Sequence, residues 1–240
     1  MPLDAGYLEG VSTQRQPRGF PTSPRPQNAS IAYRQWLAPL AAGTAVFVSA
    51  AAGPNASSFV YSRSGLGVLK TGDGSTFTGT TAFGGSAADG SMDCPRNVIV
   101  TVAHATAVVA LSGVIYGIDE YRRPIQESWS VTATGTSKLF TGKKAFARVD
   151  GVSVIGAGDA SADTVSVGRG SVLGLPMRSA LGGTGVAVKE TMDGGILATG
   201  ILTAASAAAT DDEQGTYLAA TVPNGTHNFE VWYLVNDLQL

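Results

Sequence analysis

From about residue 41 onward, apolar residues occur in short runs or at every second position, which is the pattern of β-strands. Residues 98–102 are β-branched at every position, as expected of a strand that is covered on both faces. In residues 126–132, Trp129 and Val131 alternate with serine and threonine, as expected of a half-exposed strand. No stretch shows an apolar stripe with the period of a helix. The sequence therefore predicts an all-β fold.

The spacing of these strands predicts how the body is organised. Glycine- and aspartate-rich turns separate strands at intervals of about 8–12 residues, which is typical of an antiparallel β-sandwich or barrel-like unit of immunoglobulin size. We expect this unit at residues 97–172, additional strands at residues 173–240, and a β body that spans residues 41–240 in all. Long Gly/Ser-rich loops, above all in residues 54–93, are expected to interrupt it.

The same patterns predict individual buried side chains. The last strand places Phe229, Val231, Tyr233 and Val235 on one face. Residues 98–118 carry no formal charge over a length that could cross a membrane, but β-branched residues dominate them. We therefore predict two buried strands joined near His104 instead of a membrane helix. The side chains expected in the core are Val98, Val100, Val102, Trp129, Val131, Phe146, Val165, Val167, Val231 and Tyr233.

Residues 1–40 differ from the rest because they hold six of the 11 prolines and four arginines. Proline fixes φ and removes a backbone donor, so this segment is expected to be an extended arm without a core of its own. Its large side chains favour an arm that lies on the rest of the fold or on a neighbouring chain over a solvated tail, and we expect the neighbouring chain. The expected partner-binding residues are Arg15, Arg18, Phe20, Pro21, Arg25, Tyr33, Arg34 and Trp36.

The charge balance excludes one class of function. The chain has 16 basic and 18 acidic residues, and charged residues make up 14% of it, against about 25% in an ordinary soluble domain. Without a strong field of one sign, direct binding to nucleic acid or to an anionic membrane is not expected. No basic start leads into an apolar core at the N-terminus, so a secretory signal is not expected either.

The sequence contains no motif with the spacing that catalysis or metal binding requires. One cysteine, Cys94, excludes an intrachain disulfide, and two histidines, His104 and His227, would need carboxylates to complete a zinc site. Residues 135–144 lack the glycine spacing and the hydroxyl of a phosphate-binding loop. The acidic run at residues 211–213 lacks the spacing of a calcium loop. We expect no catalytic residue, no cofactor and no metal.

Several motifs, in a fixed order, resemble those of β-rich structural proteins from tailed bacteriophages. Gly117 and Asp119 followed by Glu127 are similar to a "G-x-D-x-x-G … E" turn, with Tyr121 where a glycine is usual. The later matches are residues 144–152 with "K-A-F-x-x-V-x-x-V", residues 165–168 with "V-S-V-G", residues 174–176 with "G-L-P", and residues 212–217, 224–226 and 231–233 with "D-x-x-G-T-Y … D-G-T … V-W-Y". The resemblance covers about residues 97–240.

This resemblance implies a non-enzymatic virion structural protein, most like a capsid decoration (cement) protein that bridges and stabilises capsid subunits. The implied partners are the major capsid protein and neighbouring copies of the chain, expected as a homotrimer. The implied location is the capsid exterior, with the host cytoplasm as the site of assembly.

Two other readings stay open. The chain could be another virion component, such as a head–tail adaptor, a tail-tube subunit or a head fibre. It could also be a carbohydrate- or host-binding β module, with Tyr121, Trp129 and Trp232 as a stacking platform. An enzyme is disfavoured because no nucleophile–base pair is recognisable.

Overall fold

The computed structural model describes residues 29–52, 58–63, 79–103, 108–134, 137–156, 164–184, 186–196 and 200–236. All regular structure in these ranges is β, with sixteen strands and no helix. The predicted all-β class is therefore confirmed. Within the same ranges, no helix is long and apolar enough to cross a membrane.

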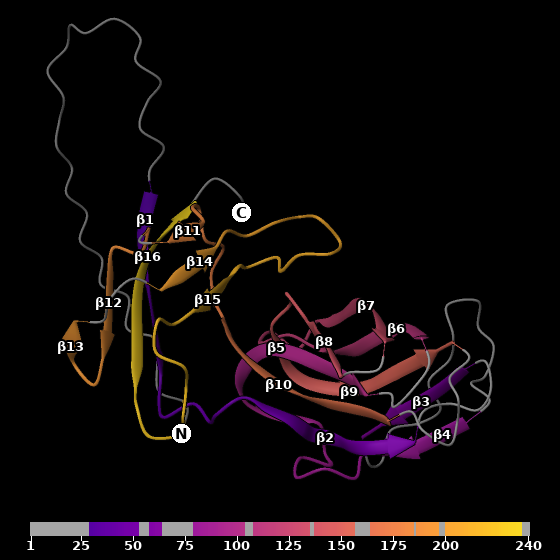
Figure 1. Cartoon of the computed structure of the whole chain (residues 1–240). Helices are drawn as coiled ribbons and strands as arrows, with labels where there is room; N and C mark the ends of the chain where they lie inside the picture. The colour runs from indigo at the N-terminus through magenta and orange to yellow at the C-terminus, as the bar shows by residue number, and fades with distance from the viewer. Residues whose placement is uncertain are drawn as a thin grey trace, which may run out of the picture.

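The strands form two lobes, which lie side by side in Figure 1. Strands β2–β10 form the central lobe, and β1 with β11–β16 forms the terminal lobe. The strands of the central lobe are β2 (Gly43–Ala52), β3 (Ser58–Ser62), β4 (Gly79–Ala82), β5 (Ser91–Ala103), β6 (Val108–Ile118), β7 (Pro124–Thr134), β8 (Lys138–Thr141), β9 (Phe146–Ile155) and β10 (Thr164–Gly174). Those of the terminal lobe are β1 (Ala29–Trp36), β11 (Gly183–Thr184), β12 (Lys189–Met192), β13 (Gly195–Ile196), β14 (Ile201–Thr203), β15 (Thr216–Leu218) and β16 (Phe229–Asn236).

The sheet of the central lobe branches and curls around a single core. Strand β10 pairs with both β2 and β5, while β9 pairs with β3, β5 and β6. Except for the parallel pair β3–β4, the strand pairs are antiparallel. Side chains from seven of these strands meet in the core. The end of β10 pairs with β15, so the sheet continues into the terminal lobe.

The predicted core side chains are buried, which confirms the strand patterns. All ten have an exposed fraction of 8% or less. Strand β7 alternates as predicted, with Trp129 and Val131 buried and Ser128, Ser130 and Thr132 exposed. On β5, Ile99 is buried as well as Val98 and Val100, as expected of a strand that is covered on both faces.

The two apolar strands predicted to be joined near His104 are present, because β5 ends at Ala103 and β6 begins at Val108, but they do not pair with each other. Strand β5 pairs with β8, β9 and β10, whereas β6 forms a long hairpin with β7. The polar turn at residues 119–123 returns the chain as β7, which pairs with β6 along the whole length of both strands. His104 itself lies outside the described residues.

The terminal lobe contains a four-stranded sheet in the order β1-β16-β12-β13, with a second core beneath it. This arrangement corrects the predicted arm, because residues 29–36 form a strand of the body. Ala32 and Trp36 point inward, and Trp36 stacks on Tyr217 with ring centroids 5.6 Å apart. The high proline content of residues 1–40 concealed a period-two pattern that begins after the last proline of the run, Pro26.

Candidate functional site

The turn between β6 and β7 is held by the carboxylate of Asp119. Its Oδ1 accepts hydrogen bonds from the backbone N–H groups of Tyr121 and Arg123, each at 2.8 Å. Its Oδ2 lies 2.6 Å from Nη2 of Arg123. The residue with positive φ in this turn is Arg122, at 62°. Tyr121 is therefore compatible with the turn, since its own backbone does not need the freedom of glycine.

Two further carboxylates, the buried Glu127 and the half-buried Asp212, accept backbone N–H groups in the same region. Glu127 of β7 accepts from Lys143 at 2.6 Å and from Lys144 at 3.4 Å. Asp212 accepts from Ala145 at 2.7 Å through Oδ2, and from Gln214 and Gly215 through Oδ1. Burial raises the pKa of both carboxyl groups, although these backbone donors oppose the shift. Their oxygens hold loops in place.

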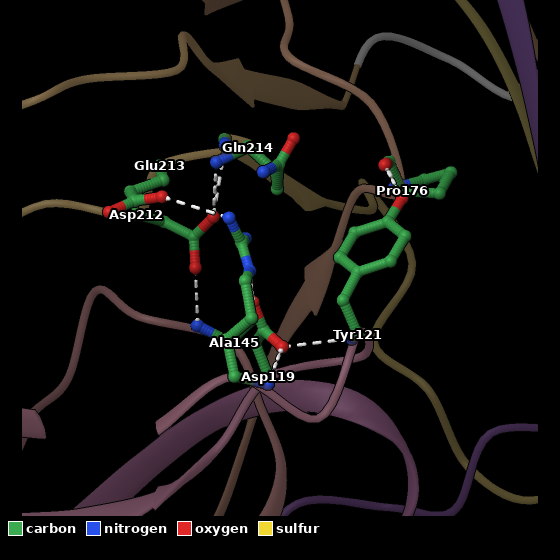
Figure 2. A network of polar contacts seen from close by, with 9 residues as sticks. Asp119, Tyr121, Ala145, Pro176, Asp212, Glu213 and Gln214 are labelled. Carbon is green, nitrogen blue, oxygen red and sulfur yellow. Dashed lines mark hydrogen bonds and ion pairs between the residues drawn. The ribbon is translucent and has the colours of Figure 1, made fainter. Parts of the chain in front are cut away.

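Asp212 connects the two lobes, because Ala145 belongs to the central lobe and the loop at residues 211–215 to the terminal lobe (Figure 2). The Tyr121 hydroxyl donates to the backbone oxygen of Pro176 across the same boundary. Three ion pairs add to these contacts: Arg34–Glu120 at 2.5 Å, Arg123–Glu213 at 3.4 Å and Lys143–Asp211 at 3.1 Å. We call this set of contacts the junction.

The junction encloses a cavity of about 50 Å³, which has room for a few water molecules and not for an organic ligand. Its exposed ion pairs are of the kind that stabilise proteins only weakly. Beside the pairing of β10 with β15, the part-buried hydrogen bond from the Ala145 N–H to Asp212 is therefore an important link between the two lobes.

We predict that Asp212→Asn lowers the free energy of unfolding by about 1–3 kcal/mol. The Asn oxygen can still accept from Gln214 and Gly215, but its amide would face the Ala145 N–H, which loses its acceptor. Asp211→Asn is the matched control, because Asp211 contacts the exposed Lys143; it should change stability by no more than about 0.5 kcal/mol. Denaturant unfolding measures both variants, and equal stability of the two would contradict the role given to Asp212.

Arg96 fixes the connection between β1 and β2 to the central lobe. Its side chain is fully buried, and it donates to the Leu40 backbone oxygen at 2.9 Å and lies 3.2 Å from Asp93. Cys94 lies beside it, and burial raises the pKa of the thiol to about 11. Cys94 is therefore a thiol at neutral pH and a weak nucleophile.

His227 pairs with a carboxylate, but this contact serves a turn. Its Nδ1 lies 2.6 Å from Asp193 Oδ2, while Asp193 Oδ1 accepts from the backbone of Asn228 at 2.8 Å. Those hydrogen bonds lower the pKa of Asp193. Among the described residues, no three His, Cys, Asp or Glu side chains are grouped so that they could hold a metal ion.

A second feature is the solvent-facing side of the β1-β16-β12-β13 sheet, which we call the outer face. The register places Tyr33, Trp232 and Lys189 in one row across three strands, with Gln35 and Glu230 in the next. The rings of Tyr33 and Trp232 are 4.8 Å apart, and the Lys189 ammonium lies 4.6 Å from the Trp232 ring centre. The face consists of Ile31, Tyr33, Gln35, Lys189, Glu230, Trp232 and Leu234.

The structure separates the predicted partner-binding residues into three groups. Arg15, Arg18, Phe20, Pro21 and Arg25 lie outside the described residues. Trp36 is buried in the chain's own core and Arg34 pairs with Glu120 at the junction, so neither is free for a partner. Tyr33 is 44% exposed and belongs to the outer face.

The three aromatic residues considered as a carbohydrate platform do not form one. Trp129 is in the core of the central lobe. Trp232 is flanked by Tyr33 and Lys189 on its two neighbouring strands. Tyr121 bonds to Pro176 at the junction, with the Arg123 guanidinium 5.5 Å from its ring centre.

Sequence reasoning missed Glu230 and Lys189 as surface residues. The signal for Glu230 was present, because Phe229, Val231, Tyr233 and Val235 were predicted to point inward. The even-numbered residues of that strand must then point outward. Lys189 could not be assigned to this face without the register of β12 on β16.

The sequence matches no protein-family model, and comparisons with curated proteins and with solved structures found no match. Inferences about the function therefore rest on the sequence and on the contacts of the described residues.

Proposed function

We propose that the chain is a non-enzymatic structural protein of a tailed-bacteriophage particle, which decorates the capsid exterior and bridges neighbouring capsid subunits. Its partners are the major capsid protein and further copies of itself, with a homotrimer as the expected assembly. It would join the shell in the host cytoplasm during assembly.

The observation that carries this proposal is the convergence of the phage-like motifs at the junction. Four separate motifs contribute residues to the lining of the cavity between the lobes. These residues are Asp119, Lys144, Ala145, Leu175 and Asp212. Glu127, from the first motif, anchors the loop that contains Lys144. Motifs scattered over about 100 residues thus build one structural feature, as expected if the resemblance reflects a shared fold.

The hydrogen bonds of the carboxylates at the junction also support a structural role. The carboxylates of Asp119, Glu127 and Asp212 each accept backbone hydrogen bonds, and the cavity beside them is small. A decoration protein needs a rigid body and surfaces that contact many equivalent sites. Weak contacts repeated by symmetry can then act together as tight binding.

The test is the stoichiometry of purified particles of the virus that encodes this chain. Quantitative mass spectrometry should find the chain in a fixed small-integer ratio to the major capsid protein, and particles that lack it should lose their DNA at a lower temperature. Absence of the chain from particles would overturn the proposal.

A second candidate is another virion component, for which the long β6–β7 hairpin is the relevant feature. A tail-tube subunit needs a hairpin that projects to the next subunit. Here Leu111, Ile115, Trp129 and Val131 of this hairpin are packed in the core. The same mass spectrometry decides between the two, because an adaptor or fibre would be present at a small fraction of the capsid copy number.

A further inference from the structure

We propose that the outer face of the terminal lobe is the docking surface for residues 17–26 of a neighbouring copy of the chain. This rests on the proposed function, because it names the surface through which the N-terminal segment ties one copy to the next. The face lies on β1 and β16, and β1 is the edge strand of its sheet in the described part of the chain.

The apolar part of the outer face suits a proline-rich ligand. Ile31 and Tyr33 are 57% and 44% exposed, beside the half-buried Trp232 and Leu234. Exposed aromatic side chains are the surfaces on which extended proline-rich segments dock, since the prolines lose little entropy on binding. Residues 17–26 contain four prolines, including Pro21 and Pro24 in P-x-x-P spacing, together with Phe20.

The charges of the two partners are complementary. The Glu230 carboxylate receives neutral donors from Tyr33, Gln35 and Thr191, at 3.2, 3.0 and 2.6 Å. No cation within the described ranges forms an ion pair with it. Residues 17–26 carry two arginines, Arg18 and Arg25, and no acidic residue. An arginine that reaches Glu230 would form a charge-assisted hydrogen bond beside the aromatic pair.

Chain connectivity favours a neighbouring copy over the same copy. Only Gln27 and Asn28 separate the segment from the start of β1 at Ala29. To lie on its own outer face, the segment would have to reverse direction within those two residues. A segment that continues away from β1 needs no reversal, and at ~3.1 Å per residue it spans about 30 Å. Docking of one copy onto the next is head-to-tail, and it closes into a ring when the rotation between copies allows.

The test is a double-mutant cycle on the self-association of the full chain, measured by sedimentation velocity. Glu230→Gln removes the charge and keeps an acceptor for the neighbouring donors, while Arg18→Gln with Arg25→Gln removes the complementary charges. Each should weaken association about five- to tenfold. All three substitutions together should weaken it no more than either alone, because they remove the same contact.

The control is Glu213→Gln, which neutralises an exposed carboxylate at the junction and should leave association unchanged. A synthetic peptide of residues 15–28 should dissociate the wild-type assemblies, and the same peptide with both arginines replaced by glutamine should do so less well. Additive effects in the cycle, no effect of Glu230→Gln, or a wild-type chain that stays monomeric at high concentration would each overturn the inference.

These outcomes are separable from those of the proposed function. If the chain is found at capsid stoichiometry but does not self-associate through Glu230, the proposed function stands and the proposed docking surface is wrong. If the chain self-associates as described but is absent from particles, the proposed docking surface stands and the proposed function is wrong.

Discussion

Replacing Trp129 with alanine is expected to lower the free energy of unfolding by about 3–5 kcal/mol. The side chain is 2% exposed in the core of the central lobe, and its Nε1 donates to the Ser153 backbone oxygen at 3.1 Å. The indole lies against Gly113, where an added Cβ would overlap that same oxygen. Removing the indole therefore leaves a cavity in the core and leaves the Ser153 carbonyl without its hydrogen-bond donor.

Far-UV circular dichroism during denaturant unfolding is the suitable measurement. The other two tryptophans, Trp36 and Trp232, lie in the terminal lobe, so their fluorescence reports separately on that lobe. The control is Ser130→Ala on the exposed face of the same strand, with an expected change within about 0.5 kcal/mol. A Trp129→Ala variant as stable as the Ser130→Ala variant would show that the indole contributes nothing to the core.

Deleting residues 2–36 is expected to unfold the terminal lobe, whereas deleting residues 2–28 is expected to leave it intact. The longer deletion removes β1, which pairs with β16 along its full length of eight residues. It also removes Trp36, whose loss alone should cost about 3–5 kcal/mol. The edge of β16 would then be exposed to pairing with other chains, so aggregation is expected.

The two deletions control for each other, since they differ only by β1. Fluorescence of Trp232, which both retain, measures the unfolding of the terminal lobe. Equal stability of the two variants would mean that β1 adds nothing to the lobe. An unfolded shorter variant would mean that residues 2–28 are needed for the fold. A folded shorter variant is also the chain from which the docking segment has been removed, so it should fail to self-associate.

Local patterns were sufficient to predict much of the fold. The alternation in β7 and β16 and the β-branched run in β5 identified the buried side chains, because strand periodicity depends only on which face is covered. Strand β1 was missed because the prolines before it dominated the composition of residues 1–40. The separate partners of β5 and β6 could not be predicted, since sequence neighbours need not be neighbours in a branched sheet.

The candidate site was only partly predictable. The phage-like motifs contain Asp119, Glu127 and Asp212, but no site role was predicted for them, because their roles depend on contacts between loops that are far apart in the chain. Asp212 and Ala145, for example, are separated by 67 positions. The outer face depends on the register of three strands, and a shift of one residue would turn Glu230 and Trp232 inward.

The pairing of β1 with β16 has a consequence for the order of events during synthesis. Tyr33 lies opposite Trp232. Strand β1 can therefore enter its sheet only after β16, the strand that carries Trp232, has been synthesised. The central lobe, whose strands lie between them, can fold on the ribosome while β1 is still unpaired. The outer face exists only after β16 has been synthesised and has paired with β1. Assembly through this face would thus be restricted to molecules that contain both strands, and a translation product truncated before β16 would be unable to join.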